Sequence, residues 1–197
     1  MSDWSHIPIL EGRHVRLEPL QSSHVEALSR AVTDGELWNC WYTSVPKPEG
    51  MASYVEAALA MKERGQALPF VVRDADGQVV GSTRFYLLDP SVPRVHIGYT
   101  WYAKRVQRTG LNTESKRLLL THAFETLGCI SVFFETSWFN HASRTAIARL
   151  GAKQDGVLRG HMRHSDGSLR DTVVFSILAA EWPAVKRHLT AKLEQRD

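Results

Sequence analysis

The sequence predicts one mixed α/β domain, in which helices pack on a central sheet. With 197 residues and 43% hydrophobic content, the chain can bury one substantial core but is short for two. Runs with the two-residue period of a strand alternate with runs that have the 3.6-residue period of a helix. No internal repeat and no low-complexity linker divides the chain, so we expect these runs to share one core.

The first half of the chain predicts a strand, two helices and a hairpin. The stretch HVRLEPL, residues 14–20, alternates apolar and polar residues, as a half-buried strand does. A helix follows from Ser23, whose hydroxyl can cap it, and a second helix over about residues 51–64 comes after an aromatic, proline-containing loop. Two β-rich runs on either side of the Asp-Gly pair at residues 76–77 then predict a hairpin.

The second half of the chain predicts four strands and three helices. A strand over residues 94–102 leads directly into a helix, whose apolar residues repeat at helical spacing as far as a stop at Gly128. A strand rich in β-branched and aromatic residues follows, and then a short helix that ends at Gly151. A hairpin that turns at residues 166–167 precedes a terminal helix over residues 181–195.

Composition narrows the classes of function. Lys and Arg exceed Asp and Glu by only 24 − 21 = 3, and no dense basic stripe carries interleaved aromatics, so nucleic-acid binding is not favoured. No stretch approaches the roughly 20 apolar residues of a membrane span, and the N-terminus lacks a leader pattern, so we expect a cytoplasmic protein and no membrane. The two cysteines, Cys40 and Cys129, match no metal-ligand spacing and suit a reducing compartment; we expect no metal.

The stretch QRTGLNT, residues 107–113, introduces the helix that follows the strand at 94–102. Gly110 lets the backbone approach a ligand closely, and Asn112 can cap the helix, which leaves amide donors at the positive end of the helix dipole. With the charge of Arg108, this end suits a pyrophosphate. The alternative is that Gly110 only turns the chain. Neither a P-loop nor a dinucleotide glycine motif follows any strand.

Two motifs resemble a known family. QRTGLN, residues 107–112, resembles the Q/R-x-x-G-x-G/A pyrophosphate loop of the GNAT acetyltransferases, except that Asn112 replaces the usual Gly or Ala. NHASRTAIARLGA, residues 140–152, resembles the N-x-x-S segment of the same family, and the nearest likeness is the branch that includes N-terminal acetyltransferases of ribosomal proteins. The resemblance implies one domain over residues 1–197, with a mixed, mostly antiparallel sheet in a core over residues 12–178.

The resemblance also implies that acetyl-CoA is the cosubstrate and which residues hold it. The strand at residues 99–102 would pair through its backbone with the pantetheine arm, amides of residues 107–113 would hold the pyrophosphate, and two polar residues would lie beside the thioester. The implied cofactor-binding residues are Tyr99, Thr100, Trp101, Tyr102, Gln107, Arg108, Thr109, Gly110, Leu111, Asn112, Thr113, Asn140 and Ser143.

Three residues are candidates for the proton transfers of acetyl transfer to an amine. His96 titrates in the right range for a base, with a structural histidine as the alternative. Glu135 is a carboxylate among apolar strand residues, with a surface glutamate as the alternative. Ser143 is the candidate to assist the leaving thiolate, because the tyrosine that many relatives use is replaced by Ile147; its alternative is a helix-capping role.

Strand alternation makes a prediction about the faces of residues 94–102. Arg94, His96, Gly98 and Thr100 should share one face, while Tyr99 should lie on the other with the apolar residues. We expect His96, rather than Glu135, to relay the proton. Four aromatic residues could line an acceptor pocket or pack in the core: Trp38, Trp41, Tyr42 and Tyr86.

The favoured function is therefore an N-acetyltransferase that moves the acetyl group of acetyl-CoA directly to a primary amine. Direct transfer is expected because no cysteine lies in either motif to carry an acyl group. The amine could belong to a small molecule or to a protein N-terminus, and a homo-oligomer stays open. Two alternatives remain at this point: a catalytically weak CoA-binding regulatory domain, and a protein-interaction domain.

Overall fold

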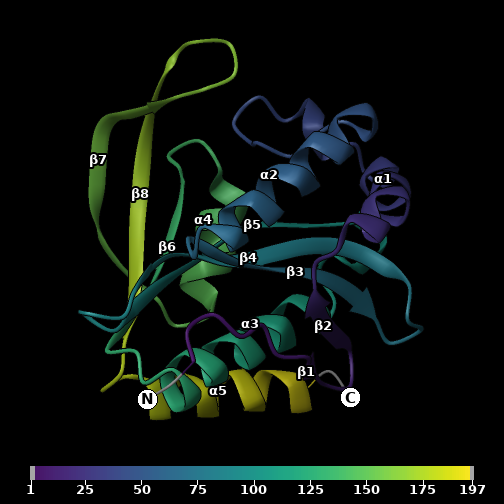
Figure 1. The fold of residues 1–197 in the computed structure, drawn as a ribbon. Helices are drawn as coiled ribbons and strands as arrows, with labels where there is room; N and C mark the ends of the chain where they lie inside the picture. Colours follow the sequence, from purple (N-terminus) through teal and green to yellow (C-terminus); the bar gives the residue numbers. More distant parts are fainter. Residues whose placement is uncertain (1–2, 196–197) are drawn as a thin grey trace.

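The computed structural model describes residues 3–195. Its centre is a sheet in which the strands follow the order β1-β2-β3-β4-β5-β6-β8-β7 (Figure 1). Only β5 and β6 pair in parallel among the described strands, and the other neighbours are antiparallel. The strands are β1 (Leu10–Glu11), β2 (Val15–Pro19), β3 (Ala67–Asp74), β4 (Val79–Asp89), β5 (Arg94–Tyr102), β6 (Ser131–Ser137), β7 (Lys153–Arg163) and β8 (Leu169–Leu178).

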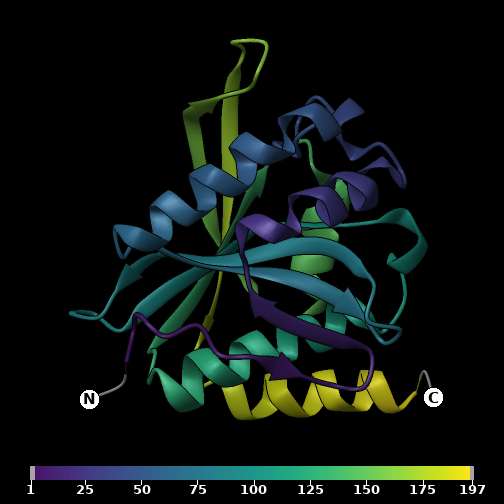
Figure 2. The ribbon, with the colours of Figure 1, turned by 45° about the vertical axis from the view of Figure 1, so that its right-hand side comes forward.

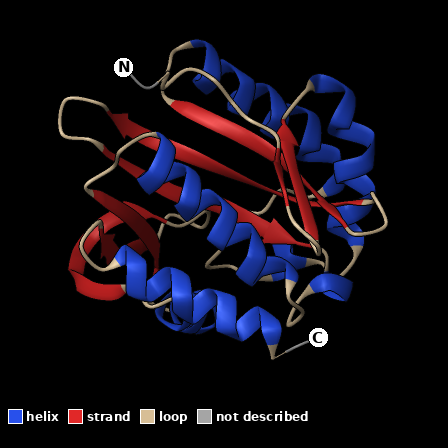
Figure 3. Ribbon diagram, turned by 90° about the horizontal axis from the view of Figure 1, so that it is seen from below, coloured by secondary structure: helices blue, strands red, loops and turns tan. Residues whose placement is uncertain are grey.

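Helices cover both faces of the sheet. Helices α1 and α2 lie over one face, and α3 and α5 run side by side under the other (Figures 1 and 2). The view from below shows this lower pair in front of the sheet (Figure 3). The helices are α1 (Val25–Thr33), α2 (Met51–Glu63), α3 (Leu111–Thr121), α4 (His141–Arg149) and α5 (Trp182–Glu194).

Each face has its own apolar core. The larger core joins the sheet to α3 and α5 and includes Phe85, Leu120 and Leu189, all fully buried. The smaller core joins the sheet to α1 and α2 through residues such as Leu28 and Val55. Burial of this apolar area is the main force that holds the layers together, at roughly 25 cal/mol per Å². Apolar packing therefore holds helices on both faces of the sheet.

The predicted order of helices and strands is confirmed, with one omission. The turn at residues 76–77 closes with the amide of Gly77 donating to Asp74 O at 3.0 Å, and Gly167 makes the equivalent bond to His164 O at 3.0 Å. Both glycines have positive φ, as tight hairpin turns require. The missed element is β1, a two-residue strand that is too short to show a period.

Two predicted helix starts are wrong. Ser23 lies in a short 3₁₀ turn whose start is capped by Gln21 and His24, so α1 begins only at Val25. The N-cap of α3 is Gly110, which places Asn112 inside the first turn. In both places a side chain able to cap stands near the true start, and the pattern alone does not locate the first helical residue.

A β-bulge in β5 changes the predicted faces. Arg84 of β4 lies opposite Gly98, but Ser82 lies opposite Trp101, so β5 carries one extra residue here. Tyr99 has φ 51° and lies on the face of His96, where its ring is 5.2 Å from that of Tyr86. The prediction that Tyr99 lies on the other face is wrong, because an inserted residue shifts the alternation.

The same bulge moves Thr100 to the opposite face. Its Oγ1 lies 2.8 Å from Nζ of Lys116 on α3 and 2.7 Å from Oγ1 of Thr83. The prediction that Thr100 shares a face with His96 is therefore also wrong. Beyond Gly98, β5 therefore presents Tyr99 to the α2 side of the sheet and Thr100 to the α3 side.

Candidate active site

The sheet divides between β5 and β6. These strands pair in parallel at only three positions, ending with His96 opposite Phe133. Beyond that point, β5 pairs with β4 and β6 pairs with β8, but the described strands do not pair with each other. One backbone edge of residues 97–102 therefore has no strand partner. The rings of His96 and Phe133 stack with their centroids 5.1 Å apart at the closed end of this division.

His96 and Glu135 meet at the closed end. Nδ1 of His96 lies 3.7 Å from Oε1 of Glu135, and 14% and 18% of the two side chains are exposed. Burial of the imidazole, with the nearby charge of Arg94 acting in the same direction, lowers the pKa of His96 to about 4. At 3.7 Å the pair makes no hydrogen bond, so the attraction of Glu135 does not offset the lost hydration. His96 is therefore neutral at pH 7.

Tyr86 and Arg170 border this pair on the same face of the sheet. The Tyr86 ring lies 5.1 Å from that of His96, and burial together with the charge of Glu135 raises the pKa of Tyr86, so its hydroxyl stays protonated. Arg170, on β8, interacts electrostatically with Glu135, Tyr86 and Tyr99. A neutral imidazole, a carboxylate, a phenol and a guanidinium thus gather where β5 and β6 separate.

The Tyr99 bulge is held by contacts from α2 and β4. The hydroxyl of Tyr54 donates to Tyr99 O at 3.3 Å, and the guanidinium of Arg84 stacks 4.0 Å from the centre of the Tyr99 ring. A non-glycine residue at positive φ costs about 1–3 kcal/mol, so it persists only where neighbours determine it. These contacts keep the unpaired edge of β5 in one conformation.

The backbone before α3 presents a group of amides. The Gln107 side chain donates to Tyr102 O at 2.9 Å, and the Leu111 amide donates to Thr109 Oγ1 at 3.2 Å. Within residues 3–195, the amides of Gly110, Asn112 and Thr113 donate to no protein acceptor, and the first backbone bond of α3 is that of the Glu114 amide to Gly110 O. The helix dipole adds partial positive charge here. This arrangement suits an anion, which is the ligand that the sequence of residues 107–113 predicts.

Gly110 has a different structural role from the one expected. Its φ is −66°, which any residue adopts, and a Cβ here would lie 3.0 Å from Cδ2 of His14. The buried carboxylate of Glu114 accepts a hydrogen bond from the His14 amide, which holds the β1–β2 turn against the start of α3. Close packing of His14 thus explains why this position is glycine.

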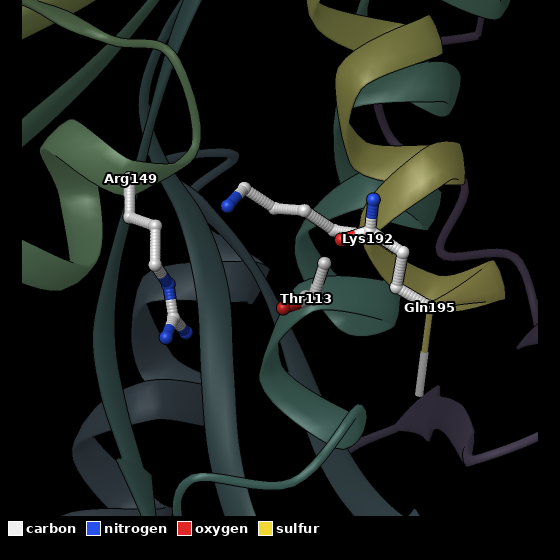
Figure 4. A pocket seen from close by; sticks show the side chains of 4 residues that line it. All are labelled: Thr113, Arg149, Lys192 and Gln195. Atoms are coloured by element: carbon white, nitrogen blue, oxygen red, sulfur yellow. The ribbon is translucent and has the colours of Figure 1, made fainter. Parts of the chain in front are cut away.

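A cavity of about 230 Å³ opens beside the backbone amides at the start of α3 (Figure 4). It is lined by Thr113 from α3, Arg149 from the end of α4, and Lys192 and Gln195 from the end of α5, and both cationic side chains point into the space. Two cations beside a helix N-terminus make this cavity strongly positive. Sequence reasoning missed Arg149 and Lys192, because only the packing of α5 against α3 brings them together.

The N-x-x-S segment forms the start of α4. Oδ1 of Asn140 accepts the Ser143 amide at 3.0 Å and so caps the helix. The capping role therefore belongs to Asn140 and to the backbone of Ser143, and the Ser143 side chain stays half-buried. Ile147 packs in the larger core, so no side chain from that position reaches the division between β5 and β6.

Of the remaining cofactor candidates, Trp101 and Tyr102 have buried side chains. Trp101 lies in the smaller core, and the Tyr102 hydroxyl donates to Ser115 Oγ at 3.2 Å. These two residues can offer only backbone groups to a ligand. Arg108 has φ 62° and turns the chain before Gly110.

The aromatic candidates divide between the loops and the core. The Trp41 ring lies 5.2 Å from that of Phe139 and 4.8 Å from that of His164, which joins the α1–α2 loop to the β6–α4 connection and to the β7–β8 turn. Tyr42 packs edge-on against Trp41. Trp38 packs on the smaller core instead. Trp41 and Tyr42 therefore border the same side of the sheet as Tyr86.

A family model described as "Acetyltransferase (GNAT) domain" matches residues 14–153. The chain belongs to the GNAT acetyltransferase family. The resemblance inferred from the two motifs is confirmed, and so is the GNAT fold with its mixed, mostly antiparallel sheet. The family match spans β5, the amide group before α3 and the start of α4.

Three relatives show how far the likeness extends. The chain is 32% identical over 111 residues to YdaF of Bacillus subtilis (strain 168), which carries the name of a ribosomal N-acetyltransferase; the match covers 56% of this chain and 60% of that relative. A GCN5-related N-acetyltransferase from Brucella melitensis is 30% identical, with a TM-score of 0.84 over 95% of this chain and 86% of that one. RimJ of Mycobacterium smegmatis, solved with CoA-disulfide, shares the fold at 22% identity and a TM-score of 0.81 over 98% and 97% of the two chains.

Two features are absent from residues 3–195. No helix in this part of the GNAT chain is long and apolar enough to cross a membrane. No group of three or more His, Cys, Asp or Glu side chains among the same residues is placed to hold a metal ion.

Proposed function

We propose that this GNAT protein is an acetyl-CoA-dependent N-acetyltransferase that transfers the acetyl group directly to a primary amine. One observation carries the proposal: the unpaired edge of β5 runs from the His96–Glu135 pair to the amide group before α3. Residues 97–102 span roughly 20 Å at about 3.3 Å per residue. That length joins a proton-accepting site to an anion-binding site along one backbone, as a thioester on a pantetheine arm requires.

The residues present fit acetyl-CoA as the cosubstrate. Amides of residues 107–113 would hold the pyrophosphate, because those of Gly110, Asn112 and Thr113 have no acceptor within the described chain. Arg149 and Lys192 would attract the phosphorylated nucleotide end of the same molecule into the neighbouring cavity. The free backbone edge of Tyr99–Tyr102 would pair with the pantetheine amides, and Asn140 and Ser143 would lie nearer the thioester.

The proton balance assigns roles to His96 and Glu135. The amine nitrogen attacks the thioester carbonyl carbon, the carbon–sulfur bond breaks, and one amine proton must leave. Neutral His96 accepts this proton, and Glu135 at 3.7 Å stabilises the imidazolium that forms. The departing thiolate takes a proton from solvent, either directly or through the Ser143 hydroxyl, which solvent then reprotonates. Both predicted base candidates thus act together in this proposal.

The remaining parts of the proposal concern acceptor, location and organisation. The name of the Bacillus subtilis relative makes a protein N-terminus an acceptor to test beside small amines, and it supports a cytoplasmic location. A single domain is supported by one sheet that runs from Leu10 to Leu178, with α5 packed on it. A regulatory CoA-binding domain is the second candidate, because the core position of Ile147 leaves no tyrosine acid there.

A thiol-release assay tests the proposal. The purified chain is given acetyl-CoA and a panel of primary amines, and free CoA thiol and N-acetylated product are measured together. We expect both to rise in equal amounts with at least one amine. If CoA raises the melting temperature but no amine raises thiol release, the chain is a regulatory domain instead.

A variant pair tests the cofactor site separately. Lys192→Met combined with Arg149→Met should weaken CoA binding, and more so at low salt, because both charges face the cavity. Lys153→Met, an exposed lysine on β7, is the matched control and should leave CoA affinity unchanged. Equal affinity in the double variant and the control would remove the cavity from the cofactor site.

A further inference from the structure

The side chains around the His96–Glu135 pair and the Tyr99 bulge hold more positive than negative charge. Arg84 and Arg170 are cationic, Glu135 is the carboxylate near them, and His96 is neutral because its pKa lies at about 4. Arg94 has its own partner, because it pairs with Asp89 at the solvent-exposed start of β5. This group of side chains therefore carries about one net positive charge before any acceptor binds.

Arg170 has no carboxylate in hydrogen-bond contact among residues 3–195, although Glu135 attracts it from further away. Its Nε is buried and makes no hydrogen bond, and the described residues offer its guanidinium no ion pair within 4.0 Å. Burial lowers the pKa of Arg170, because the attraction of Glu135 does not offset the hydration that the guanidinium has lost. Arg170 is half-buried, and a guanidinium that has lost part of its hydration usually has a carboxylate in hydrogen-bond contact, because an uncompensated charge is costly there.

Arg84, on the other side of the Tyr99 bulge, also has no carboxylate in hydrogen-bond contact among the described residues. Only 2% of it is exposed, its Nε has no hydrogen-bond partner, and its NH1 reaches only the sulfur of Met61 at 3.5 Å. The rings of Tyr54 and Tyr99 stack on its guanidinium, which compensates part of the charge. The two arginines thus face the Tyr99 bulge from β4 and β8 with one carboxylate between them.

This charge balance discriminates between classes of amine. A polyamine or another multiply cationic acceptor would bring ammonium groups next to partly buried side chains whose net charge is already positive. An amine that also carries a carboxylate would place an anion against a guanidinium that has no carboxylate in hydrogen-bond contact among the described residues, where the bonds are charge-assisted and can be bidentate. The electrostatics favour the second class.

We propose that the acceptor carries a carboxylate close to its primary amine, and that Arg170 binds this carboxylate while the amine faces His96 and Glu135. Arg84 adds positive potential behind Tyr99. This inference rests on the proposed acetyl transfer and names its substrate class. Two sources share the chemistry: a free amino acid, and a peptide whose N-terminal residue is acidic.

Matched acceptors test the inference on the unaltered protein. The first pair is an amino acid and the amine that lacks its carboxylate. The second pair is two short peptides, identical except for glutamate or glutamine at the N-terminus. We expect kcat/KM to favour the anionic member of at least one pair by roughly 10- to 100-fold, as a charge-assisted contact does. The favoured pair identifies the source.

Variants then assign the preference to Arg170. Arg170→Met should bring the ratio of kcat/KM values within the favoured pair close to one, and Arg170→Lys should leave an intermediate ratio because it keeps the charge without the planar fork. Arg159→Met removes an exposed charge from the adjacent strand β7 and should leave the ratio unchanged. The ratio within one variant does not depend on how much of that variant folds.

The outcomes separate this inference from the proposed function. Acetylation of neutral amines and polyamines at rates equal to those of the carboxylate-bearing acceptors would overturn the inference and leave the acetyltransferase standing. An anionic preference that survives in Arg170→Met would also overturn it. No acetylation of any amine would overturn both, and thiol release would then stay at the level without acceptor.

Discussion

His96 and Glu135 lie on the two parallel strands at the point where they separate, with Nδ1 of His96 3.7 Å from Oε1 of Glu135. Their positions in the sequence are 39 residues apart, and the single parallel pairing of the sheet brings them together. Because burial keeps the imidazole neutral, a proton that reaches His96 would create the charge that Glu135 is placed to stabilise.

The first prediction is that the two side chains act as one unit. His96→Ala and Glu135→Gln should each lower kcat by about 10²–10⁴-fold, because positioned general-base catalysis contributes that much. The double variant should lose little more than the worse single variant, since groups that act together are not additive. Steady-state kinetics checks this, with thermal unfolding as the control for fold. Losses that multiply in the double variant would show independent roles.

The pH dependence of kcat should reflect the low pKa of His96. Since burial places that pKa at about 4, below the ordinary 6.5, the imidazole stays unprotonated throughout the neutral range. We expect the acidic limb of kcat at saturating acceptor to fall well below pH 6.5, and to be absent in His96→Ala. An acidic limb of kcat with a midpoint near pH 6.5 in the parent protein would show that the His96 imidazole is hydrated in the enzyme–substrate complex.

The second prediction concerns Ser143. Ser143→Ala should lower kcat more than it weakens CoA binding, because the backbone amide, and not the hydroxyl, is used in capping α4. Asn140→Ala is the contrasting variant: it removes the cap and should lower the free energy of unfolding by about 1 kcal/mol. Calorimetric CoA binding and initial rates distinguish the two. Unchanged kcat in Ser143→Ala would leave solvent as the source of the thiolate's proton.

The third prediction uses the contact between Gly110 and His14. Gly110→Ala should weaken CoA binding and cost roughly 1–3 kcal/mol of stability, because the new Cβ would lie 3.0 Å from the imidazole and overpack the start of α3. Adding His14→Ala should restore much of both. Gly156→Ala on β7, where a Cβ meets nothing within 4 Å, is the control. Failure of the double variant to recover would point to the phosphate approach instead.

The fourth prediction concerns Lys116, which is buried between α3 and the sheet. Only 6% of it is exposed, and its Nζ contacts the hydroxyls of Thr100 and Thr83. Desolvation lowers its pKa from 10.5 to about 7. Between those values the unfolded chain binds one more proton than the folded chain, so stability from this group falls as the pH falls, by about 1.4 kcal/mol per pH unit.

Lys116→Met should therefore be more stable than the parent protein near pH 7, and its advantage should shrink as the pH rises toward 10. Urea unfolding at a series of pH values measures this difference. Lys62→Met, an exposed lysine on α2, should show no such trend. A constant difference across the range would mean that Lys116 stays protonated in the folded chain.

The order of the elements was predictable because it depends on local patterns. Strand β5 was predicted with its observed bounds, and both Asp-Gly hairpins formed where the turn chemistry required them. The motif at residues 107–112 also identified the family, since the backbone before a helix carries its donors within a few residues. Local periodicity and turn preferences are properties of neighbouring residues, and a single sequence displays them directly.

Only the tertiary structure decided how the site is assembled. The bulge at Tyr99 reverses the faces of the end of β5, and it depends on contacts from Tyr54 and Arg84 that no local pattern contains. The meeting of His96 with Glu135 depends on a parallel pairing across an intervening helix. The cavity between Arg149 and Lys192 exists because α5 packs against α3. Each of these relationships joins residues far apart in sequence, where burial and packing across elements, rather than neighbour preferences, set the geometry.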